Sequence, residues 1–194
     1  MMPGCGITLC INNNMKRLSS LFTLLICTLT AGNAFAQFTQ SEMVVEWQRA
    51  KTYTKAYLDS MPEDGYGFKP TPEIRSFAQQ MLHLADANYL FSFVASGKPN
   101  PIGETPQNHN TAEKTFSTTK ETVTKTVMDS YDWMINTLQG MTPDQMRQII
   151  KFHNQDITRS GIFGKAFEHQ THHRGQTTIY LRLKGVTPPG EMLF

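Results

Sequence analysis

The stretch from Ser160 to Lys184 limits the possible folds of this chain more than any other. It reads SGIFGKAFEHQTHHRGQTTIYLRLK, and its inward positions recur at spacings of three and four residues, as on one packed face of an α-helix. Gly185 and then Pro188 and Pro189 end the pattern. The positions expected to face inward are Ile162, Ala166, His169, His173, Gln176, Tyr180 and Leu183.

The middle of this predicted helix face is polar, where a packed helix normally buries leucine. Burying an imidazole or an amide costs free energy unless the group has a partner. Residues four apart lie on the same side of a helix, so His169 and His173 can direct two ring nitrogens at one cation. The spacing therefore indicates a metal site, although an H-x-x-x-H pair alone is a weak signal.

The first 36 residues have the pattern of a secretory signal peptide. Met15, Lys16 and Arg17 form a short basic head, residues 18–30 are mostly apolar, and Ala34-Phe35-Ala36 resembles a cleavage site. We therefore expect cleavage after Ala36, a periplasmic or secreted protein, and a mature domain of residues 37–194. Residues 1–14 form an upstream extension in this interpretation. A lipoprotein signal at Cys27 is less favoured, because the preceding Ile26 is bulky.

Removal of this segment changes the composition of the chain. Cys5, Cys10 and Cys27 all leave, so the mature domain has no disulfide and no thiol ligand. The count of Lys and Arg falls from 18 to 16, against 16 Asp and Glu. A balanced charge gives no electrostatic reason to expect nucleic acid as a partner. The apolar run is too short for a comfortable membrane span, so no membrane contact is expected in the mature form.

Capping patterns predict two helices upstream. Residues 39–42, Thr-Gln-Ser-Glu, form a capping box for a first helix that ends near residues 59–61. Residues 71–73, Thr-Pro-Glu, should begin a second helix that runs to about Ser96, because proline and an acid are favoured in a first turn. His83 of this helix should face the interior, since it shares a flank with Ala87, Leu90 and Val94.

A long polar connection follows over residues 97–116, and loops of this length are often functional or mobile. Residues 118–121 begin a third helix that ends at Gly140. Residues 146–153 fit either a helix or an extended connection. With the final helix, the sequence predicts an all-α domain: a four-helix bundle with a long connection between helices 2 and 3.

Three segments carry a resemblance to a known family. The run from His169 to Gln176, the tail from Leu181 to Pro189 and the segment from Leu82 to Asn88 resemble the DinB family of DinB/YfiT-like metalloenzymes. The likeness covers roughly residues 41–189. It implies a four-helix bundle that holds a divalent cation through His83, His169 and His173.

Three neutral imidazoles suit zinc, nickel or ferrous iron, and they leave a coordination position open for water or substrate. The H-E-x-x-H arrangement of metalloproteases is absent, because Gln170 follows His169. Asp86, one turn after His83, could orient a ligand or act as a base. Gln176 and Tyr180 are candidates to line the pocket or contact substrate.

The sequence favours a metal-dependent hydrolase acting on a small molecule. The resemblance also admits a thiol-dependent S-transferase, and the same scaffold admits a non-catalytic protein that binds metal or a small ligand. Expected export favours hydrolysis or binding over thiol transfer, because low-molecular-weight thiols are chiefly cytosolic. A homodimer is open as well, since such scaffolds often pair, but no residue pattern here singles out an interface.

Overall fold

The computed structural model describes residues 39–194, which are mostly helical. The elements in chain order are α2 (Gln40–Ser60), the short 3₁₀-helix η1 (Glu63–Gly65), α3 (Phe77–Ser96), α4 (Thr111–Thr115), α5 (Lys120–Gln139), α6 (Pro143–Arg147), β1 (Ile149–Phe152), β2 (Gln155–Thr158) and α7 (Arg159–Leu183). The expected signal peptide lies outside the described residues. Among residues 39–194, no helix combines the length and apolar character that a membrane span needs.

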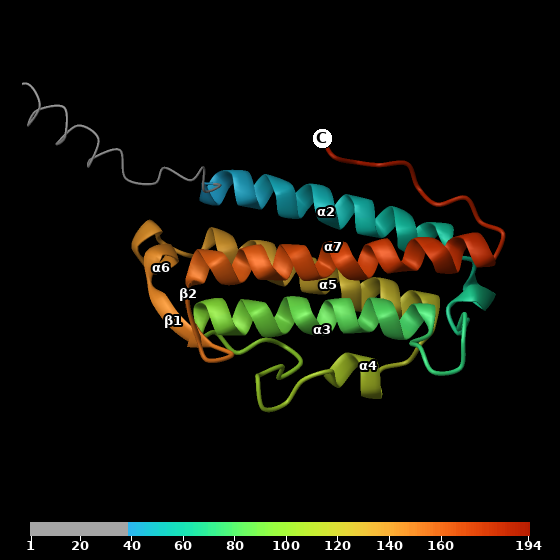
Figure 1. Ribbon diagram of the computed structural model, residues 1–194, viewed down its shortest axis with the longest axis horizontal. Helices are drawn as coiled ribbons and strands as arrows, with labels where there is room; N and C mark the ends of the chain where they lie inside the picture. Colours follow the sequence, from blue (N-terminus) through green and yellow to red (C-terminus); the bar gives the residue numbers. More distant parts are fainter. Residues whose placement is uncertain (1–38) are drawn as a thin grey trace, which may run out of the picture. The chain divides into compact units, whose positions relative to one another are not determined.

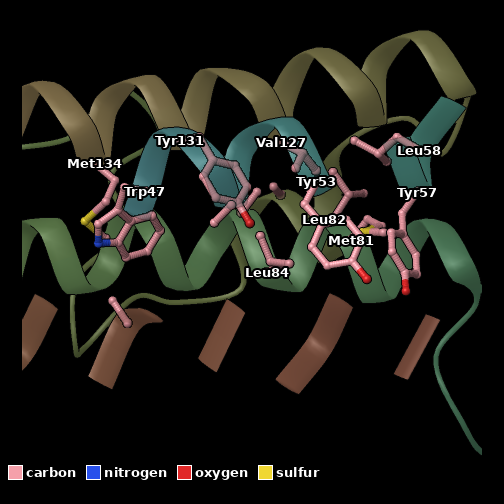
Figure 2. Close-up of a cluster of buried hydrophobic side chains, with 14 of the residues drawn as sticks. Trp47, Tyr53, Tyr57, Leu58, Met81, Leu82, Leu84, Val127, Tyr131 and Met134 are labelled. Carbon is pink, nitrogen blue, oxygen red and sulfur yellow. The ribbon is translucent and has the colours of Figure 1, made fainter. Parts of the chain in front are cut away.

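Four long helices, α2, α3, α5 and α7, lie side by side (Figure 1). Helix α3 packs against α5 and α7, and α2 packs against the same two helices. Their shared interior is filled mainly by aromatic and aliphatic side chains, including Trp47 of α2, Leu82 of α3 and Tyr131 of α5 (Figure 2). Burial of this apolar surface is the main force that holds the helices together.

Capping residues explain most helix boundaries. Thr39 and Glu42 form the predicted capping box of α2, and Thr119 caps α5, which ends before Gly140. The predicted start of the second helix at residues 71–73 was wrong. Helix α3 begins at Phe77, because Ser76 and Gln79 form a capping box there. The N–H groups of Phe77 and Ala78 also donate to backbone oxygens just after η1.

The ambiguous segment after α5 forms a short helix and a two-stranded antiparallel hairpin, which the sequence did not predict. Strand β1 pairs with β2 so that Ile149 faces Thr158 and Phe152 faces Gln155. His153 and Asn154 form the two-residue turn with φ values of 47° and 62°. Two left-handed residues in succession suit the type I′ turn that matches the twist of a hairpin.

The buried face of α7 differs in part from the predicted one. Ile162, Ala166, His173 and Tyr180 are buried as expected, but Gln176 and Leu183 are exposed. The buried face is instead widened by four other buried residues of this helix: Gln170, Arg174, Thr177 and Leu181.

Arg174 explains why this face accepts polar groups. Its guanidinium lies 4.4 Å from the ring centroid of Tyr53 and donates to Oε1 of Gln170, which also accepts from the Tyr131 hydroxyl. The cation–π contact and the shared acceptor satisfy a charge that would otherwise be costly to bury.

Candidate metal centre

Three histidine rings meet between α3 and α7. His83 comes from α3, while His169 and His173 lie one turn apart on α7. The ring centroids are 4.6 Å apart for His83 and His173, 4.3 Å for His169 and His173, and 5.2 Å for His83 and His169. One ring nitrogen from each lies within 4.8 Å of the others, so the cluster could hold a metal ion.

The surroundings favour the neutral form of all three imidazoles. Burial lowers the pKa of His169 to about 4 and of His173 to about 3, and in each case the neighbouring histidines add to the effect. Burial also lowers the pKa of His83, helped by Arg75 and opposed by Glu113 and Asn110. A neutral imidazole has a free lone pair, which is the form that coordinates a cation.

His169 has an unused polar atom in this cluster. Within residues 39–194, its Nδ1 is buried and has no hydrogen-bond partner. A buried polar atom normally has one, so an orphan nitrogen beside two other imidazoles calls for an explanation. A cation bound by the cluster would supply one, and the all-imidazole donor set suits zinc, nickel or ferrous iron.

His83 is held from the side by the connection between α3 and α5. Its Nδ1 lies 3.1 Å from Oδ1 of Asn110 and 3.2 Å from Oε2 of Glu113. Arg75 pairs with Glu113 at 2.7 Å, and its Nη2 is 3.4 Å from the same imidazole nitrogen. Asn110, Glu113 and Arg75 thus surround Nδ1 of His83 with polar groups.

His173 is held by an amide from α3. Gln80 Nε2 lies 2.8 Å from His173 Nδ1 and also donates to Oε1 of Gln176. An amide carries a donor and an acceptor at similar positions, so Gln80 can serve either tautomer of the imidazole. Gln176 in turn contacts His172, which is exposed.

A cavity of about 700 Å³ adjoins the cluster. It shares Arg75 and Glu113 with the surroundings of His83, and Gln80 with those of His173. Gln176 and Tyr180 also line it. The Tyr180 hydroxyl donates to the backbone oxygen of Arg75 at 2.8 Å, and burial raises its pKa.

Asp86 is engaged elsewhere. Its two carboxylate oxygens accept from the backbone N–H groups of Ala112 and Glu113, at 2.8 and 2.9 Å. Burial raises its pKa to about 7, although these two hydrogen bonds act in the opposite direction. Asp86 therefore supports α4, and its contacts are with that helix rather than with the imidazoles.

Sequence reasoning missed four residues around the cluster: Arg75, Gln80, Asn110 and Glu113. Gln80 could have been found, because it lies three residues before His83 and so on a neighbouring part of the same helix face. Asn110 and Glu113 belong to the polar connection, where periodicity gives no guidance. The remaining histidines, His109, His153 and His172, are exposed.

These features define a class: a mostly helical protein with three converging histidines that could hold a metal ion. The chain belongs to the DinB family, whose pattern matches residues 33–192. It is 24% identical over 155 residues to the uncharacterized protein YjoA of Bacillus subtilis strain 168. The matched region covers 76% of this chain and 92% of YjoA.

Two solved structures have a similar fold. A DinB-like protein from Bacillus cereus ATCC 10987 matches with a TM-score of 0.66 and 20% identity, covering 78% of this chain and 96% of the other. The DinB-like YjoA of Bacillus subtilis matches with a TM-score of 0.59 and 19% identity, covering 78% and 95%. At this level of identity the likeness concerns the fold.

Proposed function

We propose that the four long helices form a four-helix bundle that binds a divalent metal ion through His83, His169 and His173, and that the protein is a metal-dependent hydrolase of a small molecule. The observation that carries the proposal is the cluster itself, in which three desolvated imidazoles converge and Nδ1 of His169 has no partner among the described residues. Such a group is costly to bury without a function.

A divalent cation held by three imidazoles supplies Lewis acidity, which activates water and polarises an electrophilic substrate. The chain supplies the rest. Gln80 and Gln176 join the cluster to the cavity, so a substrate there would meet amide donors and acceptors. The cavity is large enough for a small molecule, and Ile74 and Ile179 give it an apolar side.

The proposed function is tested with purified protein loaded separately with zinc, nickel or ferrous iron. Each form is assayed on panels of esters, amides and thiol-conjugation substrates. Hydrolysis that is lost in His173→Ala supports the proposal, and activity that survives in this variant removes the metal from the mechanism. Thiol conjugation without hydrolysis would instead identify a transferase.

The matched control is His153→Asn. His153 is an exposed histidine in the hairpin turn, and asparagine tolerates its positive φ. This variant should retain both metal and activity. An equal loss in both variants would mean that the assay reports general damage to the protein rather than loss of a ligand.

A further inference from the structure

The segment of residues 97–119 between α3 and α5 is tied down by two buried carboxylates. Asp86 of α3 accepts from the N–H groups of Ala112 and Glu113, as described above. Glu104, which is fully buried, accepts from the N–H groups of Asn110 and Thr111 at 3.0 and 2.6 Å. Four consecutive backbone donors at the start of α4 are thus satisfied, which fixes this short helix against α3.

The fixed segment brings two acceptors to one atom. Asn110 Oδ1 and Glu113 Oε2 lie 3.1 and 3.2 Å from Nδ1 of His83. The Asn110 amide nitrogen is directed to Nδ1 of His109 at 2.9 Å, which leaves its oxygen for His83. Two acceptors around one imidazole nitrogen favour a proton on that nitrogen.

Arg75 is the competing neighbour, because it is a donor and its Nη2 lies 3.4 Å from the same nitrogen. However, Glu113 accepts from Nε of Arg75 at 2.7 Å and from Nη2 at 3.2 Å. The guanidinium is therefore already paired in a two-point contact, and it is the most distant of the three neighbours. The arrangement as a whole favours His83 as a donor at Nδ1.

We propose that Glu113 and Asn110 are positioning residues for His83: they hold its Nδ1–H and so leave Nε2 as the nitrogen with a free lone pair for the cluster. Asp86 and Glu104 act through them by fixing α4. The expected effect on metal affinity rests on the proposed function. Histidine ligands commonly donate their second N–H to a carboxylate or carbonyl, and loss of that partner weakens binding about 10- to 100-fold.

The experiment compares wild type with Glu113→Ala, Glu113→Gln and Asn110→Gly; glycine keeps the positive φ of 64° at residue 110 accessible. The control is Glu121→Ala, an exposed acid in the first turn of α5. Zinc and cobalt(II) affinities are measured by calorimetry and by the cobalt absorption spectrum. The tautomer of His83 is measured in the metal-free proteins by ¹⁵N NMR.

We expect the Nδ1–H tautomer in wild type and Glu121→Ala, and a mixed or Nε2–H population in Glu113→Ala. Metal affinity should fall about 10- to 100-fold in Glu113→Ala, with partial recovery in Glu113→Gln because its amide oxygen still accepts. An Nε2–H tautomer in wild type, or an affinity in Glu113→Ala equal to that of Glu121→Ala, would overturn the inference. Wild-type protein that binds no metal but shows the Nδ1–H tautomer would refute the proposed function and leave the positioning role intact.

Discussion

At the scale of single residues, the histidine cluster combines burial with mutual proximity. Both effects lower the pKa of His169 and of His173, because a protonated imidazole there would lose hydration and meet its neighbours as like charges. The imidazoles are therefore neutral and can coordinate a metal ion, while protons compete with it only weakly. Two predictions follow from this preference.

The first concerns pH. Exposed imidazoles protonate near pH 6.5, so a metal held by exposed histidines weakens as the pH falls through that value. Here the pKa of His169 is about 4 and that of His173 about 3, so protons compete with the metal only at lower pH. We expect zinc affinity, measured by calorimetry with correction for buffer protonation, to change little between pH 7 and 6 and to fall steeply toward pH 4. A steep fall beginning at pH 6.5 would contradict the low pKa values.

The second concerns His169→Leu. This substitution removes one proposed ligand together with a buried nitrogen that has no partner within residues 39–194. Leaving such a group unsatisfied costs about 1–3 kcal/mol, so the free energy of unfolding of the metal-free protein should be unchanged or higher. Metal binding should be abolished. Urea unfolding and metal titration of the same samples provide the two measurements, and unfolding of the variant would assign the cluster a structural role.

At the scale of elements, the sequence predicted those helix boundaries that nearby residues determine. The capping box at Thr39 and the ends of α5 follow from residues within one turn of each boundary. The start of α3 did not, because two candidate caps compete and the bonds of Phe77 and Ala78 to the η1 region favour the later one. His169 and His173 could be paired from their spacing alone. Asn110 and Glu113 could not, since the path of their segment depends in part on a carboxylate of α3.

The α4 segment gives the prediction at this scale. Asp86→Ala removes both acceptors of the Ala112 and Glu113 N–H groups, so we expect a loss of about 1–3 kcal/mol in the free energy of unfolding. Metal affinity should fall as well, because α4 carries Glu113. Asp86→Asn keeps one acceptor oxygen but turns an amide donor toward the other N–H group, so it should recover only part of the stability lost in Asp86→Ala. Urea unfolding distinguishes this supporting role from a catalytic role of Asp86. If Asp86 were catalytic, both variants would lose turnover while their free energies of unfolding stayed unchanged.

At the scale of the whole molecule, the core and the site use different parts of the same helices. Apolar side chains of α2, α3 and α5 fill the interior shown in Figure 2, while the imidazoles lie between α3 and α7 beside the cavity. The apolar core is the part that helix periodicity accounts for, because burial is tied to that periodicity. The polar face of α7 was predicted less well, since Gln170 and Arg174 are buried only through partners on other helices.

The last prediction is that the protein is exported and that its mature form begins at Gln37. The proposed signal peptide ends at Ala36, and α2 begins at Gln40 with Thr39 as its cap, so cleavage there would leave every described helix intact. N-terminal sequencing of protein from the periplasm or medium should start at Gln37 or its cyclised form. An Ala36→Phe variant should remain uncleaved, because the processing site requires a small residue at this position. Periplasmic or secreted protein that retains Met15, or processing that is unaffected in the variant, would refute cleavage at this site.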